Sequence, residues 1–247
     1  MKLAANCLQL DVGNSGSKWR LLREGEVVVR GTYRPQERAS QEALLGCTGA
    51  LQQIWVASVA DSEAERALAD MLAEQWGVQP WFARSGASCA GLRNSYDEPE
   101  RLGVDRWLAM LAAWRRLRGR ACVVDAGSAL TYDLVSADGQ HEGGYIIPGP
   151  TLMERALLLD TQRVRFEEEA EYELSPGQST AQAVRHGIAL AQTGALALAM
   201  DRAGIVSSQL LFCGGWGKPL MELLDRGGSY LPDLVFEGLE IMAAEAD

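Results

Sequence analysis

The stretch that decides the fold is Leu8–Lys18, which reads LQLDVGNSGSK. Its first part, Leu8–Asp11, has the apolar character of a short buried strand, and it runs into a glycine turn at Gly13–Gly16. Trp19–Leu22 and Val27–Tyr33 follow with the composition of strands. The sequence therefore predicts a hairpin and a third strand, opened by an Asp-x-Gly turn.

The same pattern starts again after Gly119. Asp125–Ala129 reads DAGSA and echoes the DVGNS of Asp11–Ser15. Strands are expected around it at Ala121–Asp125, Leu130–Val135 and Gly143–Ile147. Because both the turn and its surroundings recur, we expect a duplicated α/β fold with domains at residues 1–118 and 119–247.

Helices and further strands are expected to alternate in both halves. Apolar residues at helical spacing predict helices at Gln36–Gly46, Ser62–Trp76, Asp105–Leu117, Thr151–Leu159 and Thr180–Ala203, a short helix near Pro219–Leu223 and a terminal helix. Strands are expected at Ile54–Val59, Pro80–Ala83, Gln209–Cys213 and near Leu234–Phe236, with mostly loop over 85–102.

Composition narrows the classes of partner. The chain has 247 residues, with 33 acidic and 23 basic side chains and a formal net charge of −10. General nucleic-acid and anionic-membrane binders carry a basic surface, so neither partner is expected. Small molecules or other proteins remain.

The cysteines and the N-terminus point to the cytoplasm. The five cysteines are odd in number and include no C-x-x-C pair, so neither a disulfide framework nor a zinc site is expected. The N-terminal segment lacks the pattern of a signal peptide. The longest apolar stretch, Ile188–Met200, is too short to span a bilayer.

An Asp-x-Gly turn after a strand can hold a phosphate. Glycine lets successive backbone N–H groups converge, and no side chain at Gly13 or Gly16 blocks the approach. Asp11 can hold Mg²⁺ beside the phosphates, and Lys18 can add a positive charge. The alternative is that the glycines only shape a hairpin and Asp11 caps it. Two such turns, one in each half, could hold a polyphosphate between them.

Other nucleotide-binding motifs are missing. The chain contains neither G-x-x-x-x-G-K-[ST] nor a G-x-G-x-x-G that follows a strand. Gly214–Gly217 does follow the strand at Gln209–Cys213, and such glycines could admit an adenine or ribose. An ordinary strand-to-helix turn explains them nearly as well.

Gly103–Arg106 stands at the start of a helix. An acidic residue such as Asp105 is common there, because it complements the helix dipole. Arg106 is harder to explain, since a cation is mildly unfavourable at that end. The pair makes sense if Asp105 orients or deprotonates a hydroxyl while Arg106 meets an anion.

Together these motifs resemble the type III pantothenate kinases. The motifs that carry the resemblance, in order, are Asp11–Ser15 (DVGNS), Asn94–Pro99 (NSYDEP), Leu102–Arg106 (LGVDR), Asp125–Thr131 (DAGSALT), Gly143–Gly149 (GGYIIPG), Ser179-Thr180 with Gly187, and Gly214-Gly215. They span nearly the whole chain. Ser15 and Ser128 stand where threonine is usual, and Val104 stands where alanine is usual.

The resemblance implies two duplicated ribonuclease H-like domains of the actin-like ATPase superfamily. It implies transfer of the γ-phosphoryl group of ATP to pantothenate by a cytoplasmic homodimer, with the acceptor site at the dimer interface. ATP-binding residues would be Asp11, Val12, Gly13, Asn14, Ser15, Gly16, Ser17, Lys18 and Ser128. Pantothenate would meet Tyr96, Gly103, Val104, Asp105, Arg106 and Thr180, with Asp105 as the base. Asp125 would bind a monovalent cation, K⁺ or NH₄⁺, and Asp11 would bind Mg²⁺.

Two alternatives remain open. A non-catalytic regulator could keep this fold, since members of the family are also described as accessory transcription factors, although the basic surface for DNA is missing here. A sugar or acetate kinase of the same fold is the other, and the pattern of Tyr96 and Gly103–Arg106 argues against it.

Overall fold

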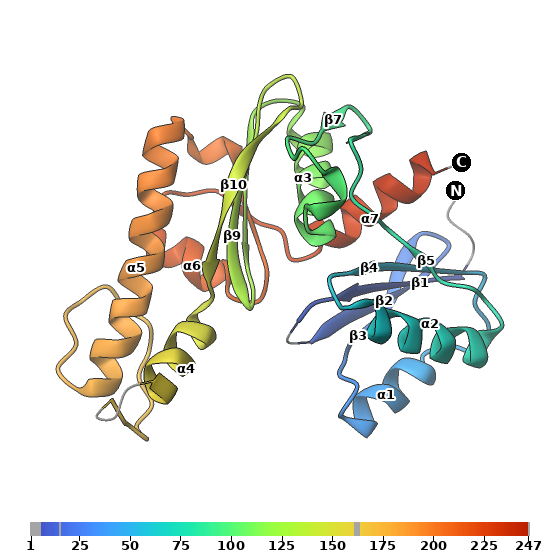
Figure 1. Ribbon diagram of the computed structural model, residues 1–247, viewed down its shortest axis with the longest axis horizontal. Helices are drawn as coiled ribbons and strands as arrows, with labels where there is room; N and C mark the ends of the chain where they lie inside the picture. Colours follow the sequence, from blue (N-terminus) through green and yellow to red (C-terminus); the bar gives the residue numbers. More distant parts are fainter. Residues whose placement is uncertain (1–5, 15, 161–163, 247) are drawn as a thin grey trace. The chain divides into compact units, whose positions relative to one another are not determined.

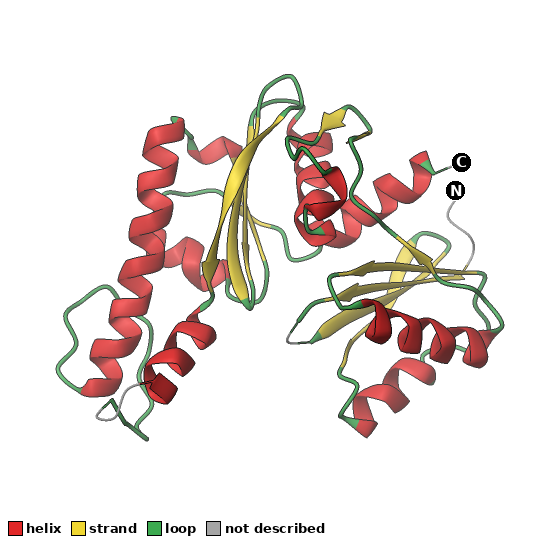
Figure 2. Ribbon diagram, viewed as in Figure 1, coloured by secondary structure: helices red, strands yellow, loops and turns green. Residues whose placement is uncertain are grey.

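The computed structural model describes residues 6–14, 16–160 and 164–246, and they form two compact units. The first unit contains the chain up to Arg116 together with the chain from Asp233 onward, and the second is Leu117–Pro232. Each unit combines one five-stranded sheet with helices (Figures 1 and 2).

The first sheet has the strand order β3-β2-β1-β4-β5. Its strands are β1 (Asn6–Val12), β2 (Ser17–Arg23), β3 (Glu26–Tyr33), β4 (Gln53–Ser58) and β5 (Trp81–Phe82). The β1–β2 and β2–β3 pairs are antiparallel, and the β1–β4 and β4–β5 pairs are parallel. The unit's helices are α1 (Arg38–Leu45), α2 (Ser62–Trp76), α3 (Val104–Leu117) and α7 (Leu234–Glu245), with a short 3₁₀ helix at Pro99–Arg101.

The second sheet repeats this arrangement in the order β10-β9-β8-β11-β12. Its strands are β8 (Ala121–Ala126), β9 (Ala129–Val135), β10 (His141–Pro148), β11 (Leu210–Cys213) and β12 (Ser229–Tyr230), with the same senses of pairing. The helices are α4 (Pro150–Asp160), α5 (Thr180–Ala203) and α6 (Gly217–Leu224), with a 3₁₀ turn at Ser207–Gln209. The predicted duplication is therefore confirmed at the level of topology.

In each unit, a hydrophobic core holds two helices against the equivalent face of the sheet. In the first unit, leucines of α1 and α2 pack on apolar residues of β1, β2 and β4. The buried members of this core are Leu8, Leu10, Trp19, Leu21, Tyr33, Leu44, Leu51, Ile54, Val56, Leu68 and Leu72. In the second unit, α5 and α6 pack on β8, β9 and β11 through Cys122, Val124, Ala126, Leu130, Tyr132, Leu196, Met200, Leu210, Phe212, Leu220 and Leu224. Alternation along each strand sends every second side chain to the opposite face.

Local sequence sets the helix ends. The Asp61 side chain accepts hydrogen bonds from the backbone N–H groups of Glu63 (3.0 Å) and Ala64 (2.9 Å) and so caps α2. Gly77, at φ 66°, ends that helix in the left-handed region that favours glycine. No helix in the described part of the chain combines the length and apolar character needed to cross a membrane.

The C-terminal segment corrects two expectations. Leu234–Phe236 is not a strand, because these buried residues begin α7, and the fifth strand of the second sheet is Ser229–Tyr230. The chain from Asp233 groups with the first unit and not with residues 119–232. A three-residue apolar run fits either element, and contacts with β1, β4 and α3 decide in favour of the helix. Within the expected loop over 85–102, Ser88–Cys89 and Leu92–Arg93 form a small hairpin.

A close crossing of α3 and α7 gives a stability prediction. The two backbones approach so closely that a Cβ at Gly238 would overlap the carbonyl oxygen of Leu108. We expect Gly238→Ala to lower the free energy of unfolding by about 2 kcal/mol, because a packed helix contact must open. Chemical denaturation measures this, with Gly49→Ala as the control, since a Cβ there meets open space. Equal stabilities of the two variants would contradict the prediction.

Candidate functional site

The first Asp-x-Gly turn joins β1 and β2. Asp11 is paired in register with Lys18, and Val12 with Ser17, so the turn sits directly above two cross-strand pairs. The N–H of Gly13 donates to the carbonyl oxygen of Gly16 at 3.2 Å and closes the turn. Asn14 and Gly16 are exposed. Ser15, which was also expected to bind ATP, lies outside the described residues.

Strand alternation divides the residues of this turn between two faces. Leu8 and Leu10 point into the core under α1 and α2, so Asp11 points to the opposite face, and Lys18 shares that face with it. Val12 and Ser17 instead line a cavity of about 580 Å³ against α2. The carboxylate and the ammonium predicted to meet a nucleotide are therefore on one side of the sheet.

The second Asp-x-Gly turn joins β8 and β9. The N–H of Gly127 donates to the carbonyl oxygen of Ala129 at 2.9 Å, and the N–H of Gly149 donates to that of Ser128 at 3.0 Å. A Cβ at Gly149 would overlap the carbonyl oxygens of Gly127 and Ser128. Gly149, at the end of β10, is thus a support of this turn.

Gly214 packs against Asp125 and Ala126, where β8 enters the second turn. It has φ of 80°, and a Cβ there would overlap Oδ1 of Asp125 and the carbonyl oxygen of Ala126. The N–H of Trp216 donates to the carbonyl oxygen of Ala126 at 2.9 Å. The tandem glycine after β11 therefore brings a third segment to Asp125, a contact that the sequence motif alone did not indicate.

Tyr96 and Arg106 meet in the first unit. Arg106 is 5% exposed, and its Nη1 donates to the hydroxyl oxygen of Tyr96 at 3.1 Å. Asn94 fixes the loop that carries Tyr96: its Oδ1 accepts from the N–H of Tyr96 at 3.0 Å, and its Nδ2 donates to the carbonyl oxygens of Gly86 and Pro99. The Asn-x-Tyr spacing thus has a structural reason, which is to aim the tyrosine at the start of α3.

Asp105 lies in the first turn of the same helix. Its Oδ1 accepts from the N–H of Arg106 at 2.8 Å. That oxygen would lie 2.7 Å from a Cβ at Gly103, so glycine there leaves room for the carboxylate. Val104 is buried in the core. The structure therefore places a partly exposed carboxylate, a buried guanidinium and a phenol around the N-terminus of α3.

Thr180 belongs to the second unit. It is the exposed first residue of α5, after Ser179, whose Oγ accepts from the N–H of Gln182 at 3.2 Å and caps the helix. Its grouping with Tyr96 and Arg106 of the first unit stays a prediction.

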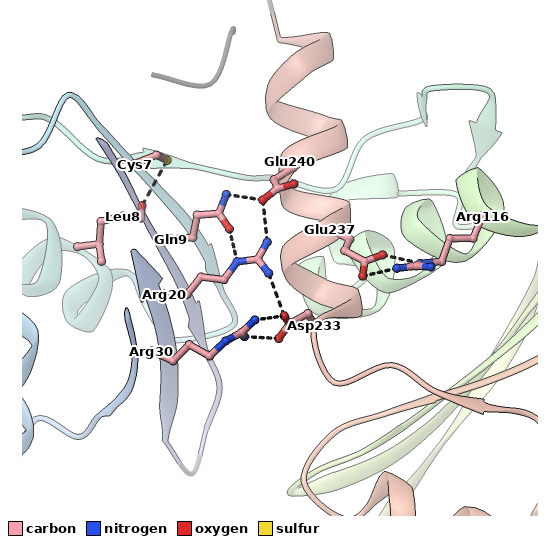
Figure 3. A network of polar contacts seen from close by, with 9 residues as sticks. All are labelled: Cys7, Leu8, Gln9, Arg20, Arg30, Arg116, Asp233, Glu237 and Glu240. Atoms are coloured by element: carbon pink, nitrogen blue, oxygen red, sulfur yellow. Dashed lines mark hydrogen bonds and ion pairs between the residues drawn. The ribbon is translucent and has the colours of Figure 1, made fainter. Parts of the chain in front are cut away.

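Charged residues that sequence reasoning missed lie beside the first turn, on the face of Asp11 and Lys18. Arg20 and Arg30 extend from β2 and β3 to Asp233 and Glu240 of the C-terminal segment (Figure 3). Burial acts to raise the pKa of Asp233, but hydrogen bonds and charges from Arg30 and Arg20 outweigh it and hold that pKa below its usual value. No local motif marks this set, because its members come from distant parts of the chain.

Comparison with known proteins gives the family. The family model described as type III pantothenate kinase matches residues 7–202. The type III pantothenate kinase of Pseudomonas putida strain KT2440 is 37% identical over 243 residues, which cover 94% of this chain and 96% of the relative. That of Ectopseudomonas mendocina is 40% identical over 244 residues, covering 95% and 97%.

Solved structures give the fold. Component A of the Acidaminococcus fermentans (R)-2-hydroxyglutaryl-CoA dehydratase matches with a TM-score of 0.55 and 13% identity, covering 99% of this chain and all of the other. A Campylobacter jejuni protein described as a Baf family transcriptional activator matches with a TM-score of 0.61 and 23% identity, covering 96% and 98%. The neighbours have the actin-like ATPase fold, as expected. With its matching motifs and full-length relatives, the chain belongs to the type III pantothenate kinase family.

Proposed function

We propose that this chain transfers the γ-phosphoryl group of ATP to the primary hydroxyl of pantothenate, giving 4′-phosphopantothenate in the first step of coenzyme A synthesis. The observation that carries the proposal is the group at the start of α3. There Asp105 stands beside Arg106, which is buried and bonded to Tyr96. Membership of the pantothenate kinase family supplies the substrate class.

Asp105 is proposed to act on the acceptor hydroxyl. It accepts a hydrogen bond from that hydroxyl and orients its oxygen for in-line attack. It takes the proton as the new P–O bond forms and the bond between the γ-phosphorus and the bridging oxygen breaks, which releases ADP. Its place at a helix N-terminus is favourable for a negative charge.

Arg106 is proposed to meet the negative charge of the acceptor. A guanidinium near a helix N-terminus can bind a carboxylate or a developing phosphate through short, charge-assisted hydrogen bonds. The Tyr96 hydroxyl, 3.1 Å from Nη1, fixes the direction of the guanidinium. Gly103, Val104 and Thr180 complete the proposed acceptor set, and Val104, being buried, offers only its backbone.

The two Asp-x-Gly turns are proposed to hold ATP. Backbone N–H groups of Asn14 and Gly16 and the charge of Lys18 would meet phosphate oxygens, while Gly13, whose N–H closes the turn, leaves room for them. Ser128 of the second turn would also contact a phosphate. This division of labour needs little covalent chemistry from the protein, as phosphoryl transfer generally does.

Asp11 is proposed as the Mg²⁺ ligand. In the described part of the chain, no three or more His, Cys, Asp or Glu side chains gather where they could hold a metal ion. One carboxylate therefore matches an ion that arrives with the phosphates and keeps its other ligands from them and from water. When bound, Mg²⁺ neutralises charge on the transferring phosphoryl group.

Asp125 is proposed to bind the monovalent cation. K⁺ and NH₄⁺ need several oxygen ligands or acceptors, and the carbonyl oxygens of Ala126, Gly127 and Ser128 belong to the same turn. The close packing of Gly214 against the Asp125 carboxylate supports a fixed position for it.

A homodimer is proposed through the second unit. Tyr145 and Ile146 on β10 are 55% and 64% exposed, and Leu190 and Leu198 on α5 are 60% and 56% exposed. A groove of about 310 Å³ lies between β10 and α5 and is lined mainly by apolar side chains. Exposed apolar surface of this kind marks protein interfaces. The cytoplasm is the proposed compartment, and the five free cysteines agree with it.

One assay tests the proposed activity. Purified protein with ATP, Mg²⁺ and pantothenate should release ADP in a pantothenate-dependent manner, faster with K⁺ than with Na⁺. Release with sugars or acetate but not pantothenate would support the alternative kinase. No release with any acceptor would support the non-catalytic regulator and overturn the proposal.

A further inference from the structure

A row of polar side chains crosses the first sheet next to the row of Asp11 and Lys18. Gln9 is paired in register with Arg20, and Arg20 with Arg30. Gln9 is two residues from Asp11 along β1, and Arg20 is two residues from Lys18 along β2. Gln9 and Arg20 therefore share a face of the sheet with Asp11 and Lys18. Two residues of an extended strand span about 7 Å, which an arginine side chain can reach across.

Arg20 has a hydrogen-bond partner at each of its three guanidinium nitrogens. Nε donates to Oε1 of Gln9 at 2.7 Å, Nη1 to Oδ2 of Asp233 at 3.1 Å, and Nη2 to Oε1 of Glu240 at 2.7 Å (Figure 3). Gln9 also donates to Glu240 at 3.1 Å. Arg20 is 4% exposed, and its guanidinium lies 4.6 Å from the ring centroid of Phe236.

Arg30 is held by the same segment. Its Nη1 and Nη2 donate to the two carboxylate oxygens of Asp233 at 2.7 and 2.6 Å. Asp233 is the residue before α7 and therefore receives both arginines at the point where the helix begins. Two carboxylates of the C-terminal segment thus neutralise two arginines that stand one row from the first turn.

The network matters for what happens when one of its members is removed. A buried ion pair adds little net stability, since desolvation offsets most of the attraction, but removing one partner leaves an uncompensated buried charge on the other. On this face of the sheet, the neighbouring row contains the Asp11 carboxylate. Arg20, once released, would compete there with the metal ion that accompanies the nucleotide.

We propose that Asp233 and Glu240 are positioning residues that hold Arg20 and Arg30 away from Asp11, and so keep the first turn competent for Mg²⁺-nucleotide. The C-terminal segment thereby acts on the site of Asp11 and Lys18 at the other end of the chain. The inference rests on the proposed function, because it assumes that Asp11 serves a metal–nucleotide complex.

The test compares Glu240→Gln and Asp233→Asn with Glu237→Gln. Glu237 is the matched control, since it lies on the same helix and pairs with Arg116 at 2.6 Å, away from the Arg20 network. We expect both network variants to bind Mg²⁺-ATP about tenfold more weakly by calorimetry and to need correspondingly more Mg²⁺ for half-maximal rate. Their kcat at saturation should stay within about twofold of the parent, and Glu237→Gln should change neither quantity.

A further variant separates positioning from stability. If released Arg20 is the competitor, Arg20→Gln in the Glu240→Gln background should restore Mg²⁺-ATP binding toward the parent value, whatever it does to the melting temperature. A lowered melting temperature with unchanged Mg²⁺-ATP binding in both single variants would overturn the inference. Failure of the parent protein to bind Mg²⁺-ATP would instead count against the proposed function.

Discussion

Asp105→Asn is expected to lower kcat for pantothenate phosphorylation by about three orders of magnitude, because it removes the group that accepts the hydroxyl proton. The substitution keeps the shape of the side chain and its Oδ1, which accepts from the N–H of Arg106 at 2.8 Å. The start of α3 should therefore stay intact. ADP release with saturating ATP and pantothenate measures the loss.

The controls for this prediction address folding and nucleotide binding. Asp70→Asn, an exposed aspartate on α2, should keep the parent activity. Asp105→Asn should keep the parent melting temperature within a few degrees and its affinity for Mg²⁺-ATP, since the predicted ATP-binding residues lie elsewhere. Turnover within about twofold of the parent would remove Asp105 from the role of base.

The duplicated architecture could be predicted because its signals are local. An Asp-x-Gly turn between two short strands needs only glycine and strand alternation, and both copies of it are hairpins in the structure. No local sequence pattern encodes the order of the strands in a sheet. The identical orders β3-β2-β1-β4-β5 and β10-β9-β8-β11-β12 nevertheless agree with one unit used twice.

The C-terminal segment could not be predicted because distant contacts decide it. The three apolar residues Leu234–Phe236 satisfy a strand or a helix equally well. What selects the helix is packing of Gly238 against Leu108 and the pairing of Asp233 with Arg20 and Arg30, more than 200 positions away along the chain.

In the candidate site, too, the sequence predicts some residues and misses others. Tyr96 and Asp105 are close in sequence, and the structure bonds Tyr96 to Arg106, the neighbour of Asp105. Their contact with pantothenate stays a prediction. The supports of the second turn, Gly149 and Gly214, have no motif that ties them to Asp125, because each arrives from the end of another strand. Sequence thus predicts candidate chemical groups more readily than the residues that hold them in place.

The second large effect is expected from Asp11→Asn, which should reduce kcat/KM for ATP by about a hundredfold. An amide oxygen is a weaker ligand for a hard divalent cation than a carboxylate, and a hundredfold loss corresponds to about 3 kcal/mol. Since Asp11 is a partly exposed residue beside a turn, the melting temperature should change little. The measurement is the rate of ADP release as a function of Mg²⁺ at fixed ATP and pantothenate.

The Mg²⁺ dependence separates this role from a structural one. If Asp11 holds the ion, excess Mg²⁺ should recover part of the lost rate in Asp11→Asn. It should recover none in Asp105→Asn, whose defect lies in proton transfer. If Asp11 only caps the hairpin, the variant should show a lower melting temperature, and its remaining rate should not respond to added Mg²⁺.

Since Lys18 is the register partner of Asp11, Lys18→Gln is the companion variant. It should weaken ATP binding and leave the Mg²⁺ concentration for half-maximal rate unchanged. A shared Mg²⁺ defect in both variants would assign the effect to the shape of the turn and contradict a specific role for the carboxylate.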